Sequence, residues 1–155
     1  MRTDPGPEGV RYLLAEYCHA FDDGRADDWA ALFTDAGSFG IDGLGDLHGR
    51  NQIAGFVSEA TAALSAAGIV GINHLTLNSA ISVGTDRAEV VSDLAMLMPA
   101  ETGFSVFALG RYRDVLIHHD RWRFDHRQVC WFGGQAPPAL LAILRPVFAG
   151  LSPVN

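Results

Sequence analysis

Three polar residues occupy alternate positions within the stretch NHLTLN at residues 73–78. In an extended strand, residues two apart share a face, so His74, Thr76 and Asn78 are predicted to line one face. Leu75 and Leu77 are then predicted to line the other face. An imidazole on the polar face of a half-buried strand indicates a lined pocket that could carry out proton transfer. The same alternation is also typical of a strand whose polar face is simply solvated.

A carboxylate, Asp22, directly follows Phe21, the last apolar residue of a preceding helical pattern. If a curved sheet folds over that helix end, Asp22 would lose part of its hydration. It could then share proton transfer with a neutral His74, because two titratable groups in different environments divide acid and base roles. The alternative is an ordinary solvated carboxylate, and sequence spacing does not decide between the two.

The composition excludes several kinds of chemistry. All eleven basic residues are arginine, so Schiff-base catalysis and a phosphate-loop lysine are excluded. The two cysteines, Cys18 and Cys130, are too few for a disulfide scaffold or a four-thiolate zinc site. The acidic residues lack the order of a calcium loop, the histidines lack a standard zinc spacing, and GLGDLHG does not fit a dinucleotide fingerprint, so we expect no metal and no cofactor. The formal net charge of −7 argues against nucleic acid or an anionic membrane as the main partner. The predicted partner is a small-molecule substrate that binds in the lined pocket.

Apolar periodicity predicts helices first and long strands afterwards. Helices are expected over residues 7–23, 25–34 and 51–67, with a short strand at 37–41 and a glycine-rich loop at 42–50. Strands are expected over residues 73–83, 87–98, 104–119 and 121–132, and a last helix over 137–148. This order predicts a single α+β domain spanning residues 1–155, in which a curved antiparallel sheet wraps around the N-terminal helices. Residues 137–150 are expected to form a C-terminal helix or lid.

No segment predicts membrane insertion or export. A run of about eighteen apolar residues is absent from the sequence, so we expect no transmembrane helix. The start MRTDPGPEG is polar and rich in Pro and Gly, unlike a secretion signal, so we expect a cytoplasmic protein.

The outer face of the predicted sheet is partly apolar, which favours self-association. Strict alternation assigns five aliphatic residues to this face: Val91, Leu109, Val115, Ile117 and Val129. Sheet-to-sheet pairing could cover them, so we expect a homodimer, with a trimer as the alternative.

Three blocks of the sequence resemble the SnoaL-like members of the NTF2-like superfamily. They are YLLAEYCHAFDDGRADDWAALFTDAGSF, NHLTLNSAISVGTDRAEVVSD and GRYRDVLIHHDRWRFDHRQV, in that order along the chain. The resemblance covers about residues 8–133 and implies a cone-shaped α+β barrel. This fold hosts dehydratases, isomerases, cyclases, epoxide hydrolases and non-catalytic binders, so the fold alone does not define the reaction.

Within that superfamily, the blocks are similar to scytalone dehydratase and the bile-acid dehydratases. In those enzymes a tyrosine, an aspartate and a histidine from the matching regions act on a hydroxylated ring. The resemblance therefore implies Tyr17, Asp22 and His74 as catalytic residues. The stretch FSVFALG lacks the second pocket histidine of scytalone dehydratase. Five further residues are predicted to bind substrate: Phe56, Asn78, Tyr112, Arg127 and Trp131.

Together these features predict a cofactor-independent lyase or isomerase, of dehydratase or cyclase type, acting on a small apolar oxygenated ring such as a polyketide, steroid or terpenoid. His74 would take a proton next to a carbonyl, Asp22 would hold the histidine tautomer or share the proton, and Tyr17 would stabilise negative charge on oxygen. One alternative is an epoxide hydrolase or ring-closing cyclase that uses Asp22 with Asp93 or Arg127. The other is a non-catalytic ligand-binding domain.

Overall fold

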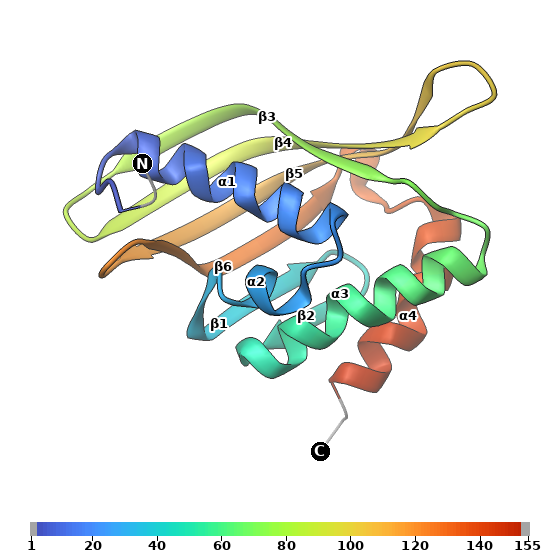
Figure 1. The fold of residues 1–155 in the computed structure, drawn as a ribbon, viewed down its shortest axis with the longest axis horizontal. Coiled ribbons are helices and arrows are strands. Elements are labelled where there is room, and N and C mark those ends of the chain that lie inside the picture. Colours follow the sequence, from blue (N-terminus) through green and yellow to red (C-terminus); the bar gives the residue numbers. More distant parts are fainter. Residues whose placement is uncertain (1–2, 153–155) are drawn as a thin grey trace.

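The structure, a computed structural model, describes residues 3–152; residues 1–2 and 153–155 of the predicted domain lie outside the described residues. Its helices and strands follow the predicted α+β order (Figure 1). In chain order the elements are α1 (Pro7–Asp22), α2 (Ala26–Ala30), β1 (Phe33–Ile41), β2 (Gly45–His48), α3 (Gly49–Ala66), β3 (Asn73–Val83), β4 (Arg87–Pro99), β5 (Phe104–His118), β6 (Trp122–Trp131) and α4 (Pro138–Leu151).

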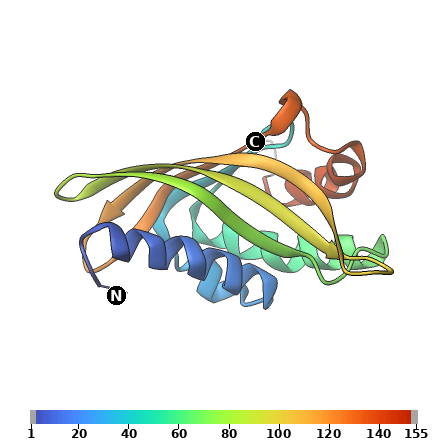
Figure 2. The same cartoon turned by 90° about the horizontal axis from the view of Figure 1, so that it is seen from above.

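The six strands form one curved sheet in the order β2-β1-β6-β5-β4-β3. Figure 2 shows the sheet arching over α1, α2 and α3, which lie on its concave side. The sheet does not close on itself, because β2 and β3 both remain edge strands, so the expected barrel is an open, curved sheet. The prediction of a purely antiparallel sheet was wrong at one pair, since β1 runs parallel to β6.

Two elements near the N-terminus differ from the prediction. The segment expected to be a loop at residues 42–50 contains β2, which forms a hairpin with β1 through the register Phe39↔Leu47. Leu47 is fully buried, and this burial explains why a glycine-rich stretch becomes a strand. The second helix is also shorter than predicted, because β1 already begins at Phe33.

A cluster of aromatic rings fills the space between the helices and the sheet. Trp29 of α2 is completely buried and contacts Phe33, Phe39 and Phe56 with ring centroids 5.2–6.0 Å apart. It also contacts Phe21 near the end of α1, at 5.5 Å. Buried aromatic side chains are among the largest contributors to core stability. This cluster therefore anchors short α2 and fixes the place where α1 ends.

The strands contain bulges, and each bulge changes which face the following residues occupy. Register shifts interrupt β3 between Leu77 and Ala80, and β6 between Phe124 and His126. A bulge inserts one extra residue, so the alternation of side chains changes phase after it. Strict alternation placed Val129 on the outer face, and this was wrong: Val129 is buried, since it follows the bulge in β6.

No helix among residues 3–152 is long and apolar enough to cross a membrane.

Candidate active site

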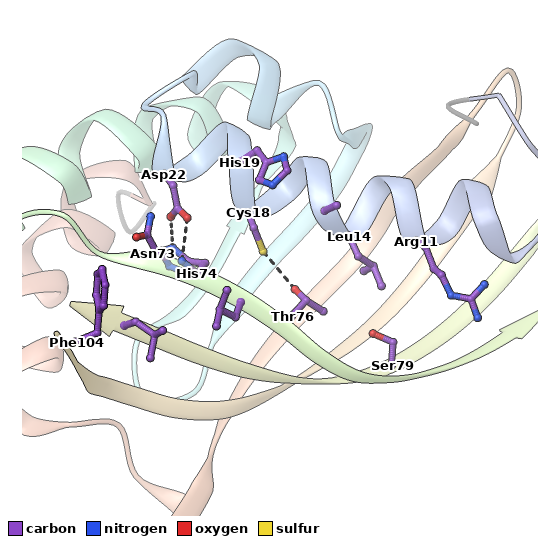
Figure 3. Close-up of a pocket in the computed structure, with 13 residues that line it drawn as sticks. Arg11, Leu14, Cys18, His19, Asp22, Asn73, His74, Thr76, Ser79 and Phe104 are labelled. Atoms are coloured by element: carbon purple, nitrogen blue, oxygen red, sulfur yellow. Dashed lines mark hydrogen bonds and ion pairs between the residues drawn. The ribbon is translucent and has the colours of Figure 1, made fainter. Parts of the chain in front are cut away.

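Asp22 and His74 meet at the junction between α1 and β3 (Figure 3). Oδ1 of Asp22 lies 2.6 Å from Nδ1 of His74, and Oδ2 accepts a hydrogen bond of 2.9 Å from the backbone N–H of the same residue. The side chains of His74 and Asp22 are only 10% and 12% exposed. The predicted contact between the helix end and the strand is thus present in the structure, and both carboxylate oxygens are used in it.

The local sequence explains this meeting. Helix α1 ends at Asp22, and Gly24 then takes a left-handed conformation (φ 70°) that reverses the chain toward α2. Because β3 is an edge strand, the N–H of His74 has no strand partner on that side and bonds to Asp22 instead. The carboxylate thereby satisfies a backbone donor and orients the imidazole at the same time.

The imidazole of His74 lies against apolar groups. Its ring packs edge-on against Phe21, with the centroids 4.7 Å apart. It also lines a small, partly open cavity of about 40 Å³ between the sheet, α1, α3 and α4. The walls are almost entirely hydrocarbon, and the polar side chains that contribute to them besides His74 are Tyr17, Tyr112 and Trp131. His74 therefore connects the Asp22 carboxylate to an apolar interior.

Tyr17 lines the same cavity from α1 and is 3% exposed. Burial raises the pKa of Tyr17, and the nearby Arg127 guanidinium opposes that rise. Tyr112 on β5 lines the cavity as well, and burial raises its pKa in the same way. Both phenols consequently stay protonated near neutral pH, and each keeps its O–H as a hydrogen-bond donor.

Phe56 and Trp131 line the cavity, as the prediction placed them. Trp131 points its indole N–H away from the cavity, because Nε1 donates to the carbonyl of Asp42 at 3.2 Å. Both residues thus provide apolar wall, together with Leu140 and Leu144 of α4.

Arg127, which was predicted to bind substrate, is not among the side chains that line the cavity. Its guanidinium is completely buried, and Nε and Nη2 donate to the two carboxylate oxygens of Asp114 at 2.8 Å each. The bulge in β6 turns Arg127 inward, beneath the rings of Tyr17 and Tyr112. Arg127 is therefore separated from the cavity by the tyrosine rings.

Asn78 is also placed differently from the prediction. It lies in the bulge of β3 with φ of 50°, and its Nδ2 donates to Oδ2 of Asp93 at 2.9 Å. Asp93 alternates with cavity-lining Leu94 and accepts a second hydrogen bond from Arg111, so this cluster belongs to the convex face. Asp93 and Asn78 thus lie away from the cavity, and the several acidic groups that an epoxide-opening site requires do not converge there.

A second hollow adjoins the Asp22–His74 pair on the outside of the molecule. It is an open groove of about 740 Å³ between α1 and β3, and both Asp22 and His74 line it. One helical turn before Asp22, the Sγ of Cys18 lies 3.3 Å from Oγ1 of Thr76 (Figure 3). The sequence analysis gave Cys18 no role in the site and missed this contact. The spacing could have indicated it: Cys18 and Asp22 lie one helical turn apart, and Thr76 and His74 lie two residues apart on one face of the strand.

Within residues 3–152, no three His, Cys, Asp or Glu side chains gather closely enough to bind a metal ion.

The fold and the sequence define the class of protein. Helices on the concave side of an open, curved six-stranded sheet are the NTF2-like arrangement, and solved NTF2-like structures superpose on this chain. Residues 7–128 match the SnoaL-like domain, and the chain belongs to that family. The superfamily comprises small-molecule-binding proteins, isomerases and dehydratases, and the SnoaL-like family includes enzymes such as scytalone dehydratase.

Three solved structures illustrate the similarity. An NTF2-like protein with a cystatin-like fold from Novosphingobium aromaticivorans has a TM-score of 0.74 at 23% identity, covering 88% of this chain and 87% of its own. A variant of the Mycobacterium tuberculosis protein Rv3472, of unknown function, has a TM-score of 0.72 at 23% identity, covering 93% and 85%. A proposed scytalone dehydratase from N. aromaticivorans has a TM-score of 0.66 at 19% identity, covering 80% and 82%. No curated protein matches the sequence.

Proposed function

We propose that this protein is a cofactor-independent lyase or isomerase that acts on a small, neutral, largely apolar ring compound carrying oxygen. One observation carries the proposal: the imidazole of His74 is hydrogen-bonded through Nδ1 to the Asp22 carboxylate and at the same time lines a hydrocarbon-walled cavity. Polar pairs placed in apolar cavities are the usual design of sites that move protons.

The geometry assigns a role to each nitrogen of His74. An ionised carboxylate can only accept hydrogen bonds, so Asp22 selects the tautomer with the proton on Nδ1. Nε2 then carries the lone pair and makes no hydrogen bond with another described residue. This is the arrangement in which a carboxylate orients a histidine base and stabilises the imidazolium that forms when the base takes a proton.

The proposed reaction moves one proton through His74. Nε2 removes a proton from the carbon next to a carbonyl, while a tyrosine hydroxyl, from Tyr17 or Tyr112, donates a hydrogen bond to the carbonyl oxygen as it gains negative charge. The imidazolium then returns the proton. Delivery to a leaving hydroxyl breaks the C–O bond and releases water, whereas delivery to another carbon shifts the double bond. Either outcome consumes no oxidant, reductant or cofactor.

The size of the cavity limits how a ring could bind. A volume of about 40 Å³ holds roughly three water molecules, whereas pockets for drug-sized ligands measure about 300–1,000 Å³. A ring compound therefore needs wall residues to move, and Leu140 and Leu144 are the ones contributed by the C-terminal helix α4. The proposal thus includes a binding step in which α4 shifts to admit the substrate.

The test begins with a thermal-shift screen of steroids, terpenoids and aromatic polyketides, followed by turnover of each stabilising compound. The variants Asp22→Asn and His74→Ala should each lower kcat by about 10²–10⁴-fold, since each removes the positioned base or its orienting carboxylate. Circular dichroism should show that both variants keep the fold.

Matched controls are available in the same chain. Asp23→Asn changes the exposed neighbour of Asp22, and His48→Ala removes an exposed imidazole on β2. Both should retain full turnover. Undiminished turnover in Asp22→Asn and His74→Ala, or ligands that bind without any conversion, would overturn the proposal and leave a binding domain.

A further inference from the structure

Arg127 and Asp114 form an ion pair at the centre of the molecule. Two parallel hydrogen bonds of 2.8 Å join them, and both side chains are 0% exposed. The guanidinium lies over three rings at once: its central carbon is 3.7 Å from the ring centroid of Tyr112, 4.0 Å from that of Tyr17 and 4.3 Å from that of Phe124. The cation is thus stacked against both tyrosines of the cavity wall.

This buried ion pair is not expected to stabilise the fold more than apolar residues would. Burying two charges removes their hydration, and apolar residues of similar volume often stabilise a core equally well or better. Moreover, Nη1 of Arg127 is buried without a hydrogen-bond partner among the described residues, which adds a further penalty. The arrangement therefore calls for a reason other than packing.

Burial and the neighbouring Arg127 cation shift the pKa of Tyr17 in opposite directions. Arg127 on β6 lowers the pKa of Tyr17, while Cys18 on the same helix and Asp114 on β5 raise it by less, and burial raises it most. Burial raises the pKa of Tyr112 most, Tyr17 raises it further, and Arg127 lowers it. At both phenols, the stacked cation counts for more than its carboxylate partner.

We propose that Arg127 is a positioning residue that acts through Tyr17 and Tyr112: it fixes the two rings against the cavity and makes their hydroxyls stronger hydrogen-bond donors. The role rests on the proposed function, in which a tyrosine stabilises negative charge on a substrate oxygen. A positive charge close to a phenol stabilises the partial negative charge that develops as the hydroxyl donates. Asp114 holds the cation in place by its bidentate contact.

The experiment measures the acidity of residue 17 without any substrate. A fluorinated tyrosine, which ionises at lower pH than tyrosine, is installed at position 17, and its ionisation is followed by ¹⁹F NMR. The double variant Arg127→Met with Asp114→Leu removes the pair without leaving an unpaired charge. In this variant the ionisation midpoint should rise by about one to three pH units, the usual effect of losing an opposite charge at this distance.

A second variant should shift the ionisation midpoint in the opposite direction, and it tests the proposal if the double variant does not fold. Asp114→Asn removes the carboxylate and keeps the cation, so the midpoint should fall. The matched control is Arg123→Met with Asp120→Leu, which removes an Arg–Asp pair at the surface end of the same strand and should leave the midpoint unchanged. A folded double variant with an unchanged midpoint, or a rise with Asp114→Asn, would overturn the role of Arg127.

The outcomes separate this inference from the function on which it rests. An unchanged midpoint together with inactive Asp22→Asn and His74→Ala variants rejects only the role of Arg127. A shifted midpoint together with full turnover in those two variants rejects the proposed reaction and leaves the electrostatic effect standing.

Discussion

Asp22 sits at a position that a carboxylate normally avoids. It is the last residue of α1, where the negative end of the helix dipole disfavours an acid by about 0.3–1 kcal/mol. Two hydrogen bonds from His74 offset this cost, because bonds to a charged group contribute about 1.5–3 kcal/mol each. The helix end therefore depends on β3 for its stability as much as the imidazole depends on Asp22 for its orientation.

Asn78 allows the convex face to be tested separately from the cavity. Asn78→Ala should lower the free energy of unfolding by about 1–2 kcal/mol, because alanine pays a steric cost at φ of 50° and the hydrogen bond to Asp93 is lost. Ligand binding and turnover should be unchanged. Urea unfolding with a parallel binding assay checks both.

Asn78→Gly is the matched control for this change, since glycine adopts the same backbone conformation without strain and should destabilise less. If Asn78→Ala lost ligand binding at unchanged stability, the result would instead show that Asn78 contributes to the binding site.

At the residue scale, sequence reasoning located the central pair and misplaced two of its companions. Periodicity places Asp22 at a helix end and His74 on the polar face of a strand, and the resemblance to scytalone dehydratase implies that the two act together. Asn78 and Arg127 could not be placed, because both follow from bulges that change the phase of alternation. A bulge leaves no mark in the apolar pattern until its pairing partner is known.

At the scale of elements, α4 is the part of the cavity wall best suited to move. It joins β6 through Phe132–Gly134, where Gly133 and Gly134 both have positive φ values of 79° and 77°. Adding a side chain at either glycine would strain the backbone, because both adopt the left-handed conformation that favours glycine. The prediction of a C-terminal helix or lid is consistent with this connection and remains a prediction as regards motion.

Leu144→Ala should widen the cavity from the α4 side. Leu144 is 4% exposed and lines the cavity, so the change should destabilise the protein by about 2–5 kcal/mol and allow larger rings to bind. A thermal-shift series of ligands of increasing size measures the change in preference.

Val147→Ala is the control for the same helix. Val147 is buried but does not line the cavity, so this variant should lose stability without a change in ligand size. Identical ligand preferences in both variants would show that α4 does not control what enters.

The long elements were predictable and the short ones were not. Helix α1 and strands β3 to β6 carry periodic patterns over ten or more residues, which is why their positions agree with the prediction. Strand β2 has four residues and a single buried side chain, Leu47, so it exists only because β1 pairs with it. The parallel pairing of β1 with β6 joins segments that are far apart in sequence, and no local pattern reports it.

At the scale of the whole molecule, the convex face of the sheet carries an apolar patch. We define the convex patch as Leu75, Leu77, Val106 and Leu109, which are 39–59% exposed. Leu75 and Leu109 lie in one row across β3, β4 and β5. Beside them, the charge of Asp93 is balanced by Arg111. In a chain of net charge −7, this is a surface on which two copies can meet without repulsion.

We propose that a second copy of this chain covers the convex patch. Sedimentation velocity should show a dimer, and Leu109→Glu should convert it to a monomer, because the interface would bury an unpaired carboxylate in an apolar patch. Val70→Glu, at an exposed aliphatic residue outside the patch, should leave the assembly intact. A monomeric parent protein, or a dimer unaffected by Leu109→Glu, would contradict the proposal, and a trimer would replace the assumed two-fold symmetry.

The tightness of the interior has a kinetic consequence. The interior cavity beside His74 has only about 40 Å³ of free volume, so a ring-sized molecule can enter that cavity only when its walls part. Association would then be governed by how often the protein opens, and its rate would level off as ligand concentration rises. The turnover rate would then depend on how often α4, which follows Gly133 and Gly134, moves away from the cavity, as well as on the proton transfer itself.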